Sequence, residues 1–168
     1  MGRIDVAAEG YLSLQGRRYR CALGRTGLVR DKREGDGATP IGDYPLRRAL
    51  YRADRLDAPK IKLPLQAIRP DDGWCDAPAD PAYNRQVRLP YAASAEALWR
   101  QDHLYDVVVV LGQNDDPPVP ERGSAIFLHV ARPDYGPTEG CVALALADLL
   151  ELLAEAGPET RLRVLDAA

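Results

Sequence analysis

Two residues of this chain, His129 and Cys141, have the types and the spacing for nucleophilic catalysis. His129 lies at the end of an apolar run, and Cys141 follows a glycine twelve positions later. A free thiol has a pKa of about 8.5, so near neutral pH only a minor thiolate fraction is a good nucleophile. A neighbouring imidazole, which titrates near neutrality, is the usual base for such a thiol. The sequence therefore predicts Cys141 as a nucleophile and His129 as its base.

Gly140 and Cys141 stand between a proline-containing loop and an apolar segment. Glycine lets the backbone adopt torsions that other residues avoid and approach a substrate closely. The N–H groups around these two residues are therefore predicted to form an oxyanion hole, in which one donor commonly contributes about 3 kcal/mol. A Gly-Cys pair alone is equally consistent with a buried thiol before a helix, and the separate histidine favours the catalytic interpretation.

Length and charge exclude several classes of protein. The 168 residues are expected to form one domain, residues 1–168, which buries roughly 70% of its unfolded surface without disulfides or a structural metal. With 22 Lys and Arg against 25 Asp and Glu, the net charge is −3, and no dense basic run indicates a nucleic-acid partner. Three separated cysteines and two histidines do not match a closed zinc site. We expect neither a metal nor a cofactor.

The N-terminal residues 1–10 lack the apolar core of a secretory signal peptide. No apolar run approaches the roughly 20 residues needed to cross a bilayer. We therefore expect a cytoplasmic protein, or a periplasmic or cell-wall protein if a leader has been removed. The sequence gives no oligomeric state.

Hydrophobic patterns predict a mainly β fold with a few helices. Strands are expected at residues 11–14, 18–24, 44–51, 107–111, 125–130 and 160–165. The first two form a hairpin with Cys21 in the core, while 107–111 is typical of a strand buried on both faces. Leucines at helical spacing predict a helix from about residue 146 that ends at Gly157. Residues 94–100 are expected to form a short helix capped by Ser94.

Residues 56–93 are rich in proline, aspartate and aromatic residues and show little periodicity. So long an irregular segment is uncommon in a compact domain unless it functions or covers a site. Trp74 and Tyr83 in this segment are predicted either to contact substrate as part of a lid or to form a small second core. The charged loop 31–42 is either a solvated connection or a carrier of binding groups.

Three segments together resemble the L,D-transpeptidase catalytic domain (YkuD-type). Residues 138–142 (TEGCV), with the upstream histidine, are similar to its Ser/Thr-His-Gly-Cys signature. Residues 39–45 (TPIGDYP) are similar to its Thr-Pro-x-Gly-x-aromatic-Pro segment, and residues 123–129 (GSAIFLH) fit the run before its histidine. The resemblance extends from about residue 20 to the C-terminus and implies a β-sandwich of mixed sheets.

Carried over to this chain, the resemblance makes Cys141 the acylated nucleophile and His129 its general base. The histidine would be held by the backbone carbonyl of Val130, while Thr138 and Gly140 would shape the turn beneath the thiol. The chain departs from the family pattern at two positions beside the substrate. Glu139 replaces a histidine, and Ala143 replaces an asparagine or arginine.

The resemblance implies acyl transfer on peptidoglycan stem peptides or muropeptides. Cys141 would attack the carbonyl between the third residue and D-Ala, and an amine or water would resolve the thioester, giving a 3→3 crosslink or a tripeptide. Arg132 could hold a substrate carboxylate, or it could be an ordinary surface arginine. The expected substrate-binding residues are Arg132, Thr138, Glu139, Trp74 and Tyr83. The alternatives are a cytoplasmic L,D-carboxypeptidase of muropeptide recycling, which the lack of a signal peptide favours, and a non-catalytic peptidoglycan-binding module.

Overall fold

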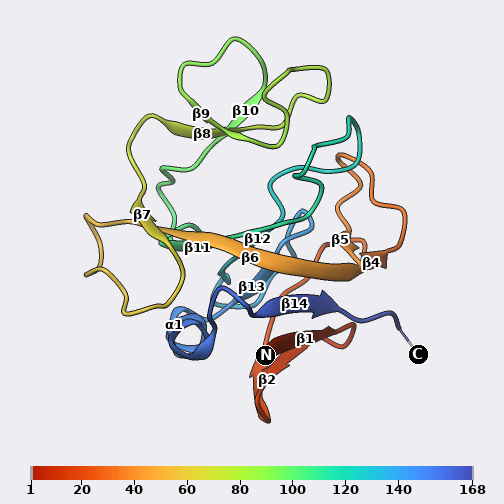
Figure 1. Ribbon diagram of the computed structural model, residues 1–168, viewed down its shortest axis with the longest axis vertical. Helices are drawn as coiled ribbons and strands as arrows, with labels where there is room; N and C mark the ends of the chain where they lie inside the picture. The colour runs from red at the N-terminus through yellow and green to blue at the C-terminus, as the bar shows by residue number, and fades with distance from the viewer. Residues whose placement is uncertain (1, 168) are drawn as a thin grey trace.

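The computed structural model describes residues 2–167, and most of its regular elements are strands (Figure 1). The elements are β1 (Arg3–Ala7), β2 (Tyr11–Leu14), β3 (Arg17–Arg20), β4 (Leu28–Val29), β5 (Thr39–Pro40), β6 (Gly42–Tyr51), β7 (Leu65–Ala67), β8 (Asp72–Cys75), β9 (Gln86–Arg88), β10 (Ala95–Ala97), β11 (Val107–Leu111), β12 (Phe127–Val130), β13 (Val142–Leu144), α1 (Leu146–Glu155) and β14 (Arg161–Val164). The predicted class, mainly β with mixed sheets, is confirmed. Strand β1 was not foreseen by the sequence pattern.

A nine-stranded mixed sheet organises the molecule, in the order β13-β12-β11-β6-β14-β1-β2-β3 with β7 also paired to β6. Strands β1 and β14, β12 and β13, and β6 and β7 pair in parallel, and the other neighbours are antiparallel. The two ends of this order meet, because Ala22, just after β3, forms an antiparallel bridge to Ala143 in β13. The sheet therefore curls around an enclosed space.

That space holds the main hydrophobic core, which we call the inner core. It combines side chains from both halves of the curled sheet, among them Ile4, Leu12, Val109 and Leu128. Helix α1 contributes the fully buried leucines Leu149, Leu152 and Leu153. The helix predicted from the leucine spacing is therefore confirmed, and its apolar face packs against the core.

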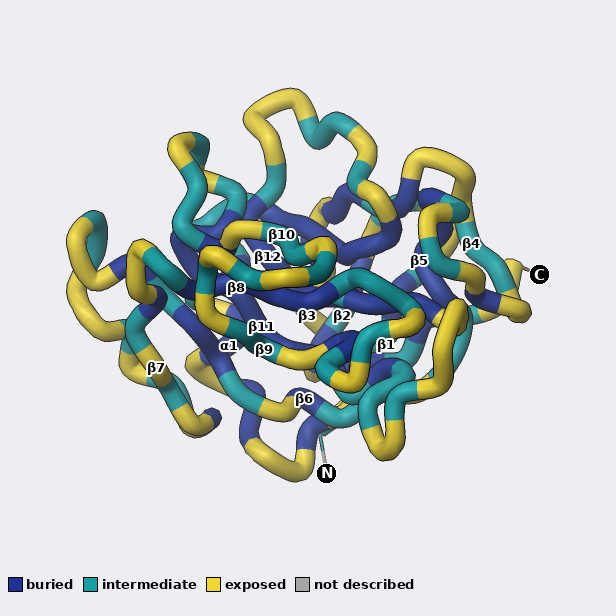
Figure 2. Tube along the Cα trace, turned by 90° about the horizontal axis from the view of Figure 1, so that it is seen from above, coloured by how far each residue is buried: buried dark blue, intermediate teal, exposed yellow. Residues whose placement is uncertain are grey.

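Strands β11 and β12 are buried on both faces, as the sequence predicted. Along β11, Val107 and Val109 face the inner core, whereas Val108 and Val110 belong to a second cluster on the opposite face. This outer cluster lies beneath the three-stranded sheet β10-β8-β9, which covers β11 and β12 in both views (Figures 1 and 2). The irregular segment 56–93 thus supplies strands that cover one face of the main sheet.

The helix predicted over residues 94–100 is wrong. Residues 95–97 instead form strand β10, in which Ala95 pairs with Cys75 and Ala97 with Gly73 of β8. Leu98, which follows this strand, is fully buried in the outer cluster. Backbone pairing to β8 and burial of this leucine outweigh a helical propensity of only a few tenths of a kcal/mol per residue.

Candidate active site

The parallel pairing of β12 and β13 brings the two predicted catalytic residues together. In this register Leu128 lies opposite Val142 and His129 opposite Ala143, so that Cys141, one residue before β13, lies alongside Phe127. Side chains alternate between faces along a strand, so Phe127, His129 and Cys141 share the outer face of the sheet. The backbone N–H of Phe127 donates a hydrogen bond to Cys141 Sγ at 3.3 Å, which fixes this juxtaposition.

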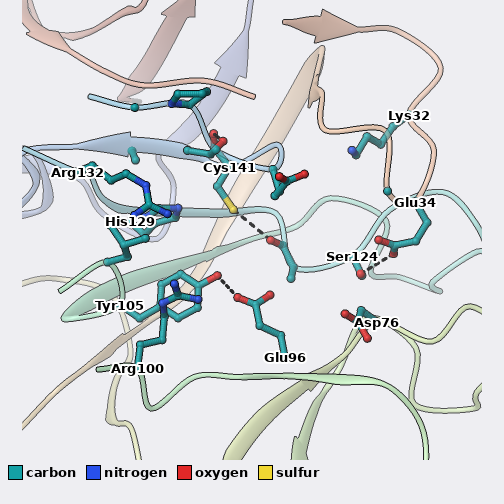
Figure 3. A pocket seen from close by; sticks show the side chains of 18 residues that line it. Lys32, Glu34, Asp76, Glu96, Arg100, Tyr105, Ser124, His129, Arg132 and Cys141 are labelled. Carbon is teal, nitrogen blue, oxygen red and sulfur yellow. Dashed lines mark hydrogen bonds between the residues drawn. The ribbon is translucent and has the colours of Figure 1, made fainter. Parts of the chain in front are cut away.

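Cys141 and His129 line one cavity of about 470 Å³ (Figure 3). Its wall is formed by Lys32, Glu34, Gly35, Asp76, Glu96, Arg100, Leu104, Tyr105, Ser124, Ala125, His129, Arg132, Gly136, Pro137, Thr138, Glu139, Cys141 and Ala143. Such a volume lies within the usual range for small-molecule and peptide-ligand pockets, about 300 to 1,000 Å³. The nucleophile and base predicted from sequence therefore face a space that can admit a substrate.

Residue Cys141 is 7% exposed, and its thiol is held by two backbone groups. Its thiol donates to the carbonyl of Ala125 at 3.2 Å and accepts from the N–H of Phe127. Burial raises the pKa of the Cys141 thiol to about 12, although the Phe127 N–H favours the thiolate. The resting side chain at neutral pH is therefore a neutral thiol.

The imidazole of His129 is oriented by Val130 and Tyr105. Its Nδ1 lies 2.9 Å from the carbonyl oxygen of Val130, as the family resemblance implied. A carbonyl only accepts, so Nδ1 carries the proton and Nε2 is left with a free lone pair. The ring of Tyr105 packs edge-on against the imidazole, with centroids 5.3 Å apart. Burial lowers the pKa of His129 to about 4, so the ring is neutral and can accept a proton.

The turn before Cys141 depends on Thr138 and Gly140. Thr138 Oγ1 donates to the Cys141 carbonyl at 2.7 Å and accepts from Gly140 N–H at 3.1 Å. Gly140 has a φ of 132°, and a Cβ there would lie 2.6 Å from the carbonyl oxygen of Ala38. Only glycine fits this close approach. Of the two amides predicted to form an oxyanion hole, that of Gly140 is thus already engaged by Thr138.

Among residues 2–167, no group of His, Cys, Asp and Glu is arranged to hold a metal ion. In the same part of the chain, no helix has both the length and the apolarity to span a membrane.

Most of the chain matches the sequence model of a known protein family. Residues 8–164 match the model of the L,D-transpeptidase catalytic domain, YkuD. This chain belongs to the L,D-transpeptidase catalytic domain family. The resemblance drawn from three short segments is confirmed, and the match begins nearer the N-terminus than those segments indicated. No curated protein sequence matches the chain.

Several solved structures of L,D-transpeptidases and related proteins are similar to this family member. An L,D-transpeptidase from Mycobacterium smegmatis is 10% identical, with a TM-score of 0.46, and the match covers 98% of this chain and 58% of that one. L,D-transpeptidase 1 of Mycobacterium tuberculosis is 10% identical, with a TM-score of 0.45 and coverage of 98% and 59%. Bd1075 of Bdellovibrio bacteriovorus is 17% identical, with a TM-score of 0.49 and coverage of 99% and 48%. The chain thus spans about half to three fifths of these proteins.

Three of the predicted substrate-binding residues, Arg132, Thr138 and Glu139, line the cavity of this L,D-transpeptidase family member. Arg132 is exposed and lies beside His129 in Figure 3. Glu139, which replaces the family histidine, is at the rim, where its carboxylate accepts from Arg25 Nε at 3.0 and 3.1 Å. The replacement therefore introduces an ion pair at the entrance rather than a second imidazole beside the thiol.

Trp74 and Tyr83 do not belong to the lining of the cavity among the residues described. Trp74 is buried in the outer cluster, edge-on to Phe127 at 5.0 Å, and its Nε1 donates to Asn84 Oδ1 at 2.9 Å. Tyr83 is also buried, and its hydroxyl donates to Glu34 Oε1 at 2.6 Å. Neither residue therefore lines the cavity as the predicted lid would. Trp74 is part of the outer cluster, which corresponds to the predicted second core, and Tyr83 holds the cavity residue Glu34 by a hydrogen bond. Their apolar rings are better satisfied by burial than by a solvated entrance.

Sequence reasoning missed seven polar residues of the cavity, namely Lys32, Glu34, Asp76, Glu96, Arg100, Tyr105 and Ser124. They come from segments far apart in the sequence that only the fold brings together. Lys32 and Glu34 had a prior signal, because loop 31–42 was predicted as a possible carrier of binding groups. That interpretation of the loop gains support, since Lys32, Glu34 and Gly35 all line the cavity.

Proposed function

We propose that this protein is a cysteine-dependent acyltransferase that acts on peptidoglycan stem tetrapeptides at the bond between the third residue and D-Ala. The observation that carries the proposal is that His129, in β12, and Cys141, one residue before the parallel neighbour β13, line one cavity. Membership of the L,D-transpeptidase family supports the reaction class.

In the first half-reaction, Cys141 Sγ forms a bond to the scissile carbonyl carbon while its proton passes to His129 Nε2. The carbonyl oxygen becomes an oxyanion, for which the backbone N–H of Cys141 is the proposed donor. The tetrahedral intermediate then collapses. The C–N bond breaks, the imidazolium returns its proton to the departing amine, and D-Ala leaves a thioester on Cys141.

Thiol and imidazole are both neutral before substrate binds, because the pKa of Cys141 is about 12 and that of His129 about 4. Their hydrogen bonds go to the backbone carbonyls of Ala125 and Val130. We therefore propose that the proton moves during attack, as general-base catalysis, rather than in a preformed ion pair. Fixed N–H donors near the sulfur, such as that of Phe127, stabilise the charge that develops.

Arg132 is proposed to hold a carboxylate of the substrate. Within residues 2–167 its guanidinium takes part in no ion pair, and it lies on the cavity wall beside the base. A guanidinium matches the planar geometry of a carboxylate, such as that of the terminal D-Ala or of diaminopimelate. Thr138 and Glu139 would shape the adjoining part of the entrance.

In the second half-reaction, the acyl acceptor attacks the thioester and regenerates the thiol. An amine from another stem would give a 3→3 crosslink, which is L,D-transpeptidation. Water would give a tripeptide, which is L,D-carboxypeptidation of the kind used in muropeptide recycling. Both reactions require the same acyl-enzyme, so the acceptor does not alter the roles of Cys141 and His129.

Incubation of the purified protein with a disaccharide-tetrapeptide, followed by mass spectrometry of the products, tests the proposal. Crosslinked dimers indicate transpeptidation, and tripeptide alone indicates carboxypeptidation. Recovery of intact tetrapeptide together with unmodified Cys141 would contradict the proposed activity and favour a non-catalytic peptidoglycan-binding module. The Cys141→Ala variant is the control for uncatalysed hydrolysis.

A further inference from the structure

Ala125 holds the Cys141 thiol from a position that the pairing of strands does not fix. Its carbonyl accepts the hydrogen bond from Cys141 Sγ at 3.2 Å, which is the dashed line at the sulfur in Figure 3. The other backbone group at the sulfur is the N–H of Phe127, a residue of β12 that pairs with Val110 of β11. Ala125 precedes β12 and belongs to no strand. Its carbonyl therefore needs an anchor of its own.

The backbone of Ala125 also has a conformation that alanine rarely adopts. Its φ is 53°, in the left-handed region, where the Cβ of an L-residue comes too close to the following carbonyl oxygen. Such a conformation persists only where the surrounding structure holds it, and conformations of this kind cluster at functional sites. The left-handed turn at Ala125 therefore indicates a specific contact that selects it.

Asn84, in the connection between β8 and β9, makes that contact. Its Oδ1 accepts from the N–H of Ala125 at 3.0 Å and from Trp74 Nε1 at 2.9 Å. Its Nδ2 donates to the carbonyls of Gln113 and Asn114, at 3.0 and 2.7 Å. The amide oxygen thus faces donors and the amide nitrogen faces acceptors, so the orientation of the side chain is fixed.

Asn84 reaches the thiol only through Ala125. The residue is 6% exposed, and among residues 2–167 it is not one of those that line the cavity of Cys141. The chain of hydrogen bonds runs from Asn84 Oδ1 to the N–H of Ala125, and from the carbonyl of Ala125 to Cys141 Sγ. A substrate in the cavity therefore meets Ala125 and Cys141 but not Asn84.

We propose that Asn84 is a positioning residue for the nucleophile: it holds Ala125 in the left-handed conformation, and the Ala125 carbonyl in turn sets the direction of the Cys141 thiol. This inference rests on the function proposed above. Without the contact, Ala125 relaxes toward a common conformation, its carbonyl turns, and the sulfur loses one of its two backbone partners. A displacement of about 1 Å in a reacting group can cost about a hundredfold in rate.

Asn84 also has an architectural role, which its two amide atoms allow us to separate. Through Nδ2 it holds the start of the loop between β11 and β12, at Gln113 and Asn114, and this contact stabilises the fold whether or not the thiol reacts. Through Oδ1 it holds Ala125 at the end of the same loop. A variant that keeps the oxygen and loses the N–H groups should therefore lose stability but keep the position of the thiol.

The rate of thioester formation on Cys141 tests the proposal. It is followed in a single turnover with a stem tetrapeptide, by intact-protein mass spectrometry. For Asn84→Gly, in which glycine adopts the φ of 57° at this position without strain, we expect the maximal rate constant to fall about 10- to 100-fold. The concentration at half-saturation should stay within about threefold of wild type, because Asn84 lies outside the cavity wall. Unfolding alone would lower the fraction of protein that reacts and not the rate constant.

Two further variants separate positioning from stability. The matched control is Asn114→Gly, because Asn114 also has a positive φ, 51°, and its side chain bonds to Val119 and Gly123 but not to Ala125. It should unfold at a lower temperature and acylate with the wild-type rate constant. Asn84→Asp keeps an oxygen toward Ala125 and should recover most of the rate that Asn84→Gly loses. Its second oxygen would face two carbonyl oxygens, so its Tm should still fall.

Hydrogen exchange at the Ala125 amide tests the same contact in the wild-type protein, even if no variant at Asn84 folds. Measured by NMR, this amide should be protected although it lies outside the strands, because its hydrogen bond to Asn84 is buried within the fold. Exchange as fast as that of an exposed loop amide would overturn the inference.

An unchanged rate constant in Asn84→Gly, or an equal loss in Asn114→Gly, would overturn the inference and leave the proposed acyltransferase intact. Equally slow acylation by Asn84→Asp and Asn84→Gly would also overturn it, because the contact of Oδ1 with Ala125 would then be without effect. Absence of a thioester in the wild type would instead defeat the proposed function, and this inference with it.

Discussion

Cys21 and Cys141 are two of the three thiols of this chain, and of these two only Cys141 lines the cavity. Both residues are buried, with exposures of 5% and 7%, and burial raises the pKa of each thiol to about 12. They sit where the ends of the sheet meet, since Ala22 bridges Ala143. Cys21 packs into the inner core, whereas Cys141 belongs to the outer cluster and lines the cavity.

Neither burial nor the pKa of the thiol therefore distinguishes the cysteine that we propose as the nucleophile from the one in the inner core. The difference is the face of the sheet to which each side chain points. On the outer face, Cys141 receives the N–H of Phe127 and shares the cavity with a neutral imidazole. On the inner face, burial is the one cause that raises the pKa of Cys21.

Replacement of Cys141 by alanine should abolish turnover, because the thioester cannot form without the sulfur. We expect a loss of at least about a thousandfold in tripeptide or dimer formation, as is common for nucleophile deletions. Product formation is measured by mass spectrometry, and circular dichroism checks that the fold is kept. Turnover close to the wild-type rate would show that another group is the nucleophile.

Replacement of His129 by glutamine should reduce the acylation rate by about 10²- to 10⁴-fold, the usual contribution of a positioned general base. Glutamine can retain a bond to the Val130 carbonyl but cannot accept the thiol proton. The rate is measured from accumulation of the Cys141 thioester under single-turnover conditions. A matched control is His103→Gln, which removes the other histidine, a largely exposed side chain. A loss as large in the control would contradict the assignment.

The pH dependence of acylation should lack the usual histidine limb near pH 6.5. The base must be neutral, and burial lowers the pKa of His129 to about 4. Because the folded pKa is lowered, protonation begins only at more acidic pH. The value of kcat/KM should therefore stay level through pH 6.5 and fall tenfold per unit only below about pH 4. Measurement on a small activated acyl substrate tests this, and a limb centred near pH 6.5 would contradict it.

Replacement of Cys21 by alanine should affect stability and leave turnover within about twofold of wild type. Loss of one buried sulfur costs about 1 kcal/mol, which corresponds to a fall of roughly 2 to 4 °C in Tm for a chain of this size. Thermal unfolding and the tetrapeptide assay measure the two effects. A large loss of turnover with normal stability would remove the distinction between the two thiols.

The sequence predicted those parts of the fold whose periodicity is strong. The apolar run at β11 and the leucine spacing of α1 each have one plausible structure, and both are confirmed. Residues 95–97 were predicted as helix and form a strand, because pairing with β8 is a tertiary contact that local propensity does not contain. The expected few helices reduce to one α-helix in the part of the chain that the structure describes.

For the site, the residues that the sequence marked lie close to one another in the chain. His129, Thr138, Gly140 and Cys141 come from one loop and its flanking strands; His129, Thr138 and Cys141 line the cavity, and Gly140 lies in the turn before Cys141. Glu34, Asp76 and Glu96 also line the cavity but come from three distant segments, so the sequence did not indicate that they are neighbours. Trp74 and Tyr83 stood out in the sequence as aromatic residues. In the fold, Trp74 packs against Phe127 and Tyr83 donates a hydrogen bond to Glu34, and neither lines the cavity.

The mass of the intact protein after brief exposure to a stem tetrapeptide, followed by peptide mapping, tests whether Cys141 is the acylated nucleophile. We predict an adduct with the mass of the tripeptide acyl group, located on Cys141, with Cys21 and Cys75 unmodified and no adduct on Cys141→Ala. An adduct on another cysteine, or an unmodified protein under conditions in which a known L,D-transpeptidase is acylated, would contradict the account.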